Sequence, residues 1–274
     1  MSDFGPIALL IALAAAYTAG VQRAWARAGR DRLVRVHQAV YFALGLAATL
    51  AALVGPLDRR AVHSLTAHMV QHVILLGVAA PLLATGEPTT ALLWTLPDDT
   101  RRRAGASWRA VQRSQRGRGW AVWIGATILV QTAVVFAWHV PAVYDAAVRH
   151  PLLHGLEHLT FLLSAGAFWW VVAGTGWKSR QGAGIFAVFA GWFPMMGLGV
   201  LMTLAATAWY PAYVTGSAAA ALRDQQMAGA VMWSVGGLTS VIGAAVLFAS
   251  WLASVDKRHP PGESIVVPPL EAMR

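Results

Sequence analysis

The chain has 274 residues, of which 57% are hydrophobic and only 12% are charged. A soluble domain of this size would lack the charged surface that keeps it dissolved, so the composition excludes a soluble globular protein. The absence of cysteine excludes disulfides, thiolate metal sites and cysteine nucleophiles, so any metal must be held by His, Met, Asp or Glu.

Seven apolar runs are each long enough to cross the hydrocarbon core of a bilayer, which takes roughly 20 residues. In chain order they are 5–22, 36–55, 64–84, 120–140, 152–174, 183–208 and 227–252. The residues before the first run, Met1-Ser2-Asp3, contain no basic segment, so we expect a retained first helix and not a signal peptide. The sequence therefore predicts an all-α, polytopic membrane protein with a seven-transmembrane-helix bundle over residues 1–252.

The basic residues lie mostly on one side of these predicted spans. Seventeen of the 21 fall after the first span, in the loop 85–119, after the fifth span, and at the C-terminal end. The other side has only Arg59, Arg60, Arg149 and Arg223. Because short loops rich in Lys and Arg stay in the cytoplasm, we expect the N-terminus outside and the C-terminus inside, in the inner (plasma) membrane of a bacterium.

The basic loop 85–119 also carries Trp94 and Trp108, a mixture that suits a segment at the anionic inner face of the bilayer. We expect it to contact membrane lipid, and we expect no nucleic-acid partner. The proline-containing residues 253–274 are predicted to form an extended cytoplasmic tail.

Seven of the nine histidines fall on the predicted outer side, at the ends of the third, fourth and fifth spans. They are His63, His68, His72, His139, His150, His154 and His158. His68 and His72 are four residues apart, as are His154 and His158, so each pair projects from one face of a helix. Ionisable residues are costly in hydrocarbon and usually face the bundle interior or a cavity. The pattern predicts a metal or cofactor site made by these two pairs, with His139 as a fifth candidate.

Histidine alone does not decide among zinc, copper, iron and nickel. Methionines at the same ends of the spans, Met69 among them, favour Cu(I), because soft thioethers select that ion. Glu157 and Asp224 lie on the same side as supporting candidates. Three chemistries remain open: a His/Met copper site, a single bis-histidine haem, and a membrane-embedded zinc hydrolase in which His154-Gly155-Leu156-Glu157-His158 supplies an H-x-x-E-H pattern.

Several blocks of sequence resemble one family. The stretch His68-Met69-Val70-Gln71-His72-Val73-Ile74-Leu75-Leu76, followed by Ala80-Pro81-Leu82-Leu83 and Gly86-Glu87-Pro88, resembles the signature of CtaG-type cytochrome c oxidase assembly factors of the multi-span Bacillus type. Further blocks follow in the same order: Trp138-His139-Val140-Pro141, the stretch from His154 to His158, and Asp224-Gln225-Gln226 leading to Met232-Trp233. The resemblance covers most of residues 35 to 252. An unrelated single-span copper chaperone of the same name binds copper through cysteines and is excluded.

The resemblance implies a role in maturing haem–copper oxidases, with the catalytic subunit as the partner that receives copper. It implies that the metal ligands are His68, His72, His139, His154 and His158, and that Met69, Glu157 and Asp224 are supporting residues of the metal site. His63 and His150 have no counterpart in the family pattern, and their role, capture of an ion at the mouth of the site or none, stays open. We therefore expect a copper-binding membrane protein without enzymatic activity.

Overall fold

The computed structural model describes residues 4–116, 118–173, 181–214 and 216–256, and within these ranges it contains helices and no strand. Seven helical runs are long and apolar enough to cross a membrane. They are Gly5–Ala28, Val36–Ala61, Leu65–Thr85, Gly119–Trp138, Pro151–Ala173, Gly182–Thr203 and Ala218–Ala253. The predicted all-α architecture with seven spans is confirmed.

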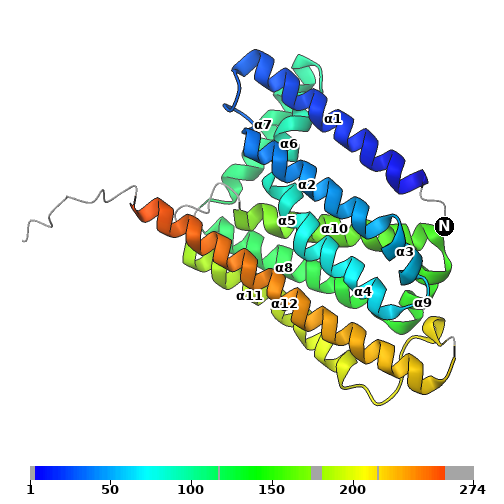
Figure 1. Cartoon of the computed structure of the whole chain (residues 1–274). Coiled ribbons are helices and arrows are strands. Elements are labelled where there is room, and N and C mark those ends of the chain that lie inside the picture. The colour runs from blue at the N-terminus through cyan, green and yellow to red at the C-terminus, as the bar shows by residue number, and fades with distance from the viewer. Residues whose placement is uncertain (1–3, 117, 174–180, 215, 257–274) are drawn as a thin grey trace, which may run out of the picture.

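One edge of the bundle is formed by α1 (Phe4–Ala28), which packs against α2 (Val36–Leu53) and the short α6 (Pro88–Leu93) (Figure 1). The ring of Tyr17 stacks on that of Phe42, with their centroids 3.7 Å apart. Most of the remaining surface of α1 is exposed and apolar, as expected for a helix that faces lipid.

The opposite edge is formed by α11 (Gln181–Thr203) and α12 (Ala218–Asp256), which run side by side (Figure 1). Their backbones touch where Gly199 faces Gly229, because a Cβ atom on Gly229 would lie 2.5 Å from the carbonyl oxygen of Gly199. Small residues at such crossings let membrane helices approach closely enough for van der Waals packing to hold them together.

Between these edges lie the helices that carry the predicted histidine pairs. The third span consists of α4 (Leu65–Ile74), a π-helical turn η1 (Leu75–Ala79) and α5 (Ala80–Thr85). It packs against α10 (Pro151–Ala173), which in turn packs on α8 (Gly119–Trp138). A π-helical turn inserted in an α-helix is rare and is frequent at functional sites, and this one follows His72 by a single turn.

The two ends of the bundle differ in charge. α7 (Asp98–Ser114) lies at the end where α1 and α12 finish (Figure 1). There Arg27 Nη1 lies 3.2 Å from Asp98 Oδ2. We call this the arginine-rich end; the prediction that it faces the cytoplasm rests on the positive-inside rule alone.

The opposite, arginine-poor end is closed by short elements. These are α3 (Pro56–Ala61), α9 (Pro141–Arg149) and the 3-10 turn η3 (Pro211–Tyr213). They hold polar and aromatic side chains over the ends of the spans, so the interior of the bundle is partly covered at this end.

Some element boundaries differ from those predicted. The predicted loop 85–119 contains α6 and α7, and the last helix begins at Ala218 and not near 227. α12 also continues to Asp256, while residues 257–274 of the predicted tail lie outside the described residues. Hydropathy detects only the part of a helix inside the bilayer, so polar first turns and amphipathic helices beside the membrane were assigned to loops.

Candidate metal centre

A hydrogen-bonded cap fixes the start of α4 and therefore the position of the first histidine pair. Ser64 is the N-cap residue, and its Oγ accepts from the backbone N–H of Ala67. Asp224 of α12 accepts from Ser64 Oγ at 3.1 Å and from the backbone nitrogens of Leu65 at 2.7 Å and Thr66 at 3.2 Å. The carboxylate of Asp224 is thus engaged in joining α12 to α4, and it caps a helix instead of lying among the histidines.

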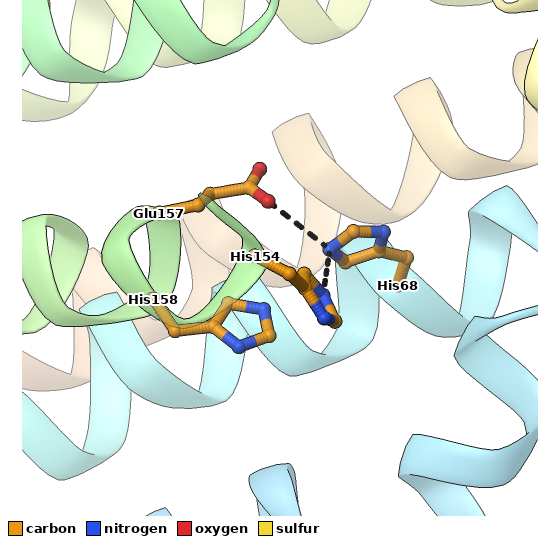
Figure 2. Close-up of side chains that lie close together, drawn as sticks. All are labelled: His68, His154, Glu157 and His158. Atoms are coloured by element: carbon orange, nitrogen blue, oxygen red, sulfur yellow. Dashed lines mark hydrogen bonds and ion pairs between the residues drawn. The ribbon is translucent and has the colours of Figure 1, made fainter. Parts of the chain in front are cut away.

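Four side chains converge between α4 and α10. Figure 2 shows His154, Glu157 and His158 reaching from α10 towards His68 of α4. One ligand atom from each of the four lies within 4.8 Å of the others, and all four residues are buried. The spacing of three and four residues puts the α10 members on one face of that helix. We call these four residues the His/Glu cluster.

The distances in the His/Glu cluster suit a metal ion. The Nε2 atoms of His68 and His154 are 3.3 Å apart, and Glu157 Oε2 is 3.8 Å from His68 Nε2. Two nitrogens bound at about 2.05 Å to a tetrahedral ion lie about 3.3 Å apart. The His68–His154 pair therefore has the spacing that two ligands take around one ion, and the ligand atoms of Glu157 and His158 lie within 4.8 Å of it.

Several polar atoms of the cluster are buried and lack hydrogen-bond partners among the residues that the structure describes. These are both carboxylate oxygens of Glu157 and Nε2 of His158. Buried polar groups are normally hydrogen-bonded, and a buried carboxylate that stays charged requires a positive partner. A cation held by these atoms would satisfy both requirements.

Two tyrosines orient His68. Its Nδ1 lies 2.7 Å from the hydroxyl of Tyr144 and 2.8 Å from that of Tyr213. Tyr213 donates its proton to the carbonyl oxygen of Ala61 at 2.9 Å, and Tyr144 is hydrogen-bonded to Tyr213. Burial raises the pKa of both phenols, so both stay protonated. With the Tyr213 proton on Ala61 and the Tyr144 proton on Tyr213, neither hydroxyl has a proton left to donate to His68. Nδ1 of His68 must then carry the proton and donate it to the tyrosines. In this tautomer Nε2 has a lone pair that can bind a metal.

The other two predicted ligands lie beside the cluster. His72 Nε2 is 3.5 Å from Glu157 Oε1, and its ring centroid is 6.1 Å from that of His139. His139 is the C-cap residue that follows α8, and its Nδ1 donates to the carbonyl oxygen of Val135 at 2.7 Å. Burial lowers the pKa of His139 to about 4, so its ring is neutral at neutral pH and its Nε2 carries a lone pair.

Comparison with known families agrees with the resemblance of the sequence. A family model for cytochrome c oxidase caa3 assembly factors (Caa3_CtaG) matches residues 15–254. The chain belongs to this family. No curated protein and no solved structure matches it significantly. All the blocks that carried the predicted resemblance fall inside the matched range.

In this Caa3_CtaG chain a cavity of about 170 Å³ connects the His/Glu cluster to the arginine-poor end. It is lined by His68, His154 and Tyr213 on the inside and by the exposed Arg149 at its mouth. A small ion has room to pass along it, since one water needs roughly 15 Å³ of such space. The cluster is therefore accessible from this end.

The remaining predicted residues of the Caa3_CtaG chain lie at different places. His63 and His150 are exposed at the arginine-poor end, outside the His/Glu cluster. Met69 is fully buried and lies beside His72. Sequence reasoning missed Tyr144 and Tyr213, because tyrosines near span ends are typical interfacial anchors and nothing in their spacing marks a contact with His68.

Proposed function

We propose that this assembly factor binds copper at the His/Glu cluster and supplies it to the catalytic subunit of a haem–copper oxidase. The observation that carries the proposal is the convergence of three buried imidazoles and a buried carboxylate whose oxygens have no hydrogen-bond partner among the described residues. The family places the chain in cytochrome c oxidase assembly. Supplying a metal requires a site that can hold an ion and release it to a partner, and this buried cluster with its access cavity supports such a role.

Copper is the ion that this donor set favours. Among first-row divalent ions, sites with nitrogen and oxygen ligands bind Cu²⁺ most tightly, and neutral imidazoles also accept Cu(I). The oxidases that the family assembles carry copper beside a haem, so their assembly requires a source of copper, which a copper site in this chain would provide. We propose that the ion enters by the cavity at Arg149 from the outer side of the membrane. It then leaves by exchange of one ligand at a time with the partner.

Haem fits this arrangement poorly. The ring centroids of His68 and His154 are 5.0 Å apart, and those of His68 and His158 are 5.6 Å apart. Imidazoles this close to each other leave no space for a macrocycle between them. We therefore propose a bare ion in place of a haem.

The experiment is a metal analysis of the purified protein after growth with copper. We expect copper in the wild type and less copper per chain in His154→Ala, while the matched variant His150→Ala, an exposed histidine four residues earlier, keeps the wild-type amount. Oxidase activity in cells should fall with His154→Ala and stay unchanged with His150→Ala. Full copper content together with normal oxidase activity in His154→Ala would refute the proposal.

One observation favours a second candidate, a zinc hydrolase. Glu157 lies beside His154 and His158 of the H-x-x-E-H pattern, with His68 available as a third ligand. In such an enzyme the glutamate is the base and not a ligand. Turnover of a membrane peptide that disappears in Glu157→Gln, with zinc still bound at wild-type affinity, would favour the hydrolase over the copper donor.

A further inference from the structure

A second cavity, of about 60 Å³, lies next to the His/Glu cluster in the centre of the bundle. It is lined by residues of α4, η1, α8, α10, α11 and α12. The side chains that matter for its chemistry are His72, His139, Met69, Met195 and Met232. We call this the His/Met cavity. Its volume suits one ion with one or two waters, and it is far too small for an organic cofactor.

Both histidines of this cavity have free ring nitrogens. His72 is 3% exposed, and neither of its nitrogens has a hydrogen-bond partner among the described residues. His139 is 6% exposed, and its Nε2 also has none, while its Nδ1 proton is used on Val135. A hydrogen bond from one ring nitrogen to a backbone carbonyl is the usual arrangement behind a metal-binding imidazole. His139 has this arrangement, and His72 offers ring nitrogens that no described residue occupies, so each ring can accept an ion.

The three methionines of the cavity come from three different helices. Met69, Met195 and Met232 are all buried, on α4, α11 and α12 respectively. Buried methionine often only fills space. Here, however, Gln131 Nε2 approaches the sulfur of Met195 at 3.9 Å, which places a sulfur lone pair in a polar contact inside the cavity. No sulfur belongs to the His/Glu cluster, whereas three of the four buried methionines among the described residues line this cavity, the fourth being Met202.

We infer that the His/Met cavity is a second metal position, specific for Cu(I), which takes the ion from the His/Glu cluster. The inference rests on the proposed function for the identity of the metal. Thioethers select Cu(I) over harder ions, and two neutral imidazoles complete a soft ligand set without adding charge. The ion stays Cu(I) throughout, so no electron is transferred.

The contacts between the two positions provide a path. His72 lies 3.5 Å from Glu157 and its ring centroid is 5.4 Å from that of His158. A Cu(I) ion can therefore exchange a ligand of the His/Glu cluster for His72 before it leaves the first position. The softer position then holds the ion deeper in the bundle, away from the access cavity at Arg149.

The test is an anaerobic Cu(I) titration of the full-length protein in detergent, combined with copper X-ray absorption spectroscopy. We expect two Cu(I) per chain in the wild type, with sulfur among the ligands. Met195→Leu/Met232→Leu leaves only the sulfur of Met69 in the cavity, so this variant should bind one Cu(I) tightly and lose most of the sulfur ligation, while leucine conserves the volume of methionine. The matched control is Met227→Leu, on α12 but 57% exposed, which should still bind two. If the double variant does not fold, each single substitution should still lower the sulfur ligation and the affinity for the second Cu(I), by less than the double variant would.

A second variant separates this inference from the proposed function. His154→Ala/His158→Ala should lose the first copper and keep one with sulfur ligation. Absence of sulfur ligation in the wild type, or unchanged stoichiometry in Met195→Leu/Met232→Leu, would overturn the second position even if a His154-dependent copper is present. Unchanged copper in the histidine variant, with the sulfur-ligated copper lost in the methionine variant, would support the cavity and refute the His/Glu cluster.

Discussion

Two carboxylates at the arginine-poor end, Glu157 and Asp224, look alike in sequence but have opposite surroundings. Glu157 lies in the first turns of the fifth span and Asp224 just before the predicted seventh span, and both were predicted to support a metal site. Asp224 accepts hydrogen bonds from two backbone nitrogens and from the hydroxyls of Ser64 and Thr66. Glu157 is 0% exposed, and neither of its oxygens has a hydrogen-bond partner among the described residues.

The difference distinguishes a carboxylate that stabilises the fold, Asp224, from one whose oxygens are available to bind a metal ion, Glu157. A carboxylate whose acceptor positions are filled by backbone donors contributes to folding and has little capacity left for an ion. A buried carboxylate without hydrogen-bond donors is costly to keep charged, and a cation bound beside it would remove that cost. The predictions below change one of these two environments at a time.

The largest effect is expected from Glu157→Gln. The variant removes the negative charge of the His/Glu cluster. Loss of a residue that only hydrogen-bonds to a metal ligand can lower metal affinity by roughly 100-fold, and we expect the affinity of this variant for copper to fall by more than that. The metal-free variant should unfold at the same temperature as the metal-free wild type or higher, because a neutral amide is less costly to bury than a carboxylate. Competition with a copper chelator and thermal unfolding measure the two effects. A metal-free variant that is clearly less stable would mean that Glu157 has a structural role like that of Asp224.

Tyr144→Phe should have the next largest effect. The substitution removes the hydroxyl that lies 2.7 Å from Nδ1 of His68 and leaves the ring in place. Loss of such an orienting partner typically lowers metal affinity by roughly 10- to 100-fold. The same chelator competition measures it, with Tyr41→Phe, an exposed tyrosine of α2, as the matched control. Equal affinities in the two variants would show that Tyr144 does not orient His68.

The sequence predicted the histidine pairs better than their surroundings. Two histidines four residues apart share a helix face in any α-helix, so the pairs on α4 and α10 followed from local geometry. Their meeting across the bundle depended on how the third span packs on α10. The contacts of Tyr144 and Tyr213 with His68 depend on short elements that fold back over the span ends, and no periodicity encodes them.

The effects expected of Asp224→Asn are the opposite of those expected of Glu157→Gln: stability should fall and copper binding should stay unchanged. The amide keeps the size of the side chain but loses the charge-assisted hydrogen bonds to Leu65 and Thr66, so the free energy of unfolding should fall by about 1–3 kcal/mol. Copper per folded chain should stay at the wild-type value. Chemical unfolding in detergent and metal analysis of the folded fraction measure the two quantities. Loss of copper from correctly folded Asp224→Asn protein would instead make Asp224 part of the metal site.

Ser64→Ala should give the smallest effect, since it removes one N-cap hydroxyl while Asp224 keeps its two backbone donors. The expected loss is about 1 kcal/mol, the usual effect of an N-cap substitution. Ser64 and Asp224 share one network, so the destabilisation of the double variant Ser64→Ala/Asp224→Asn should be smaller than the sum of the two single effects. Combining Ser64→Ala with Glu157→Gln should give additive effects, because the cap and the His/Glu cluster have no hydrogen bond in common. Strongly non-additive effects of Ser64→Ala and Glu157→Gln would mean that the start of α4 and the His/Glu cluster are energetically coupled. In that case the N-cap would affect metal binding by changing the position of His68.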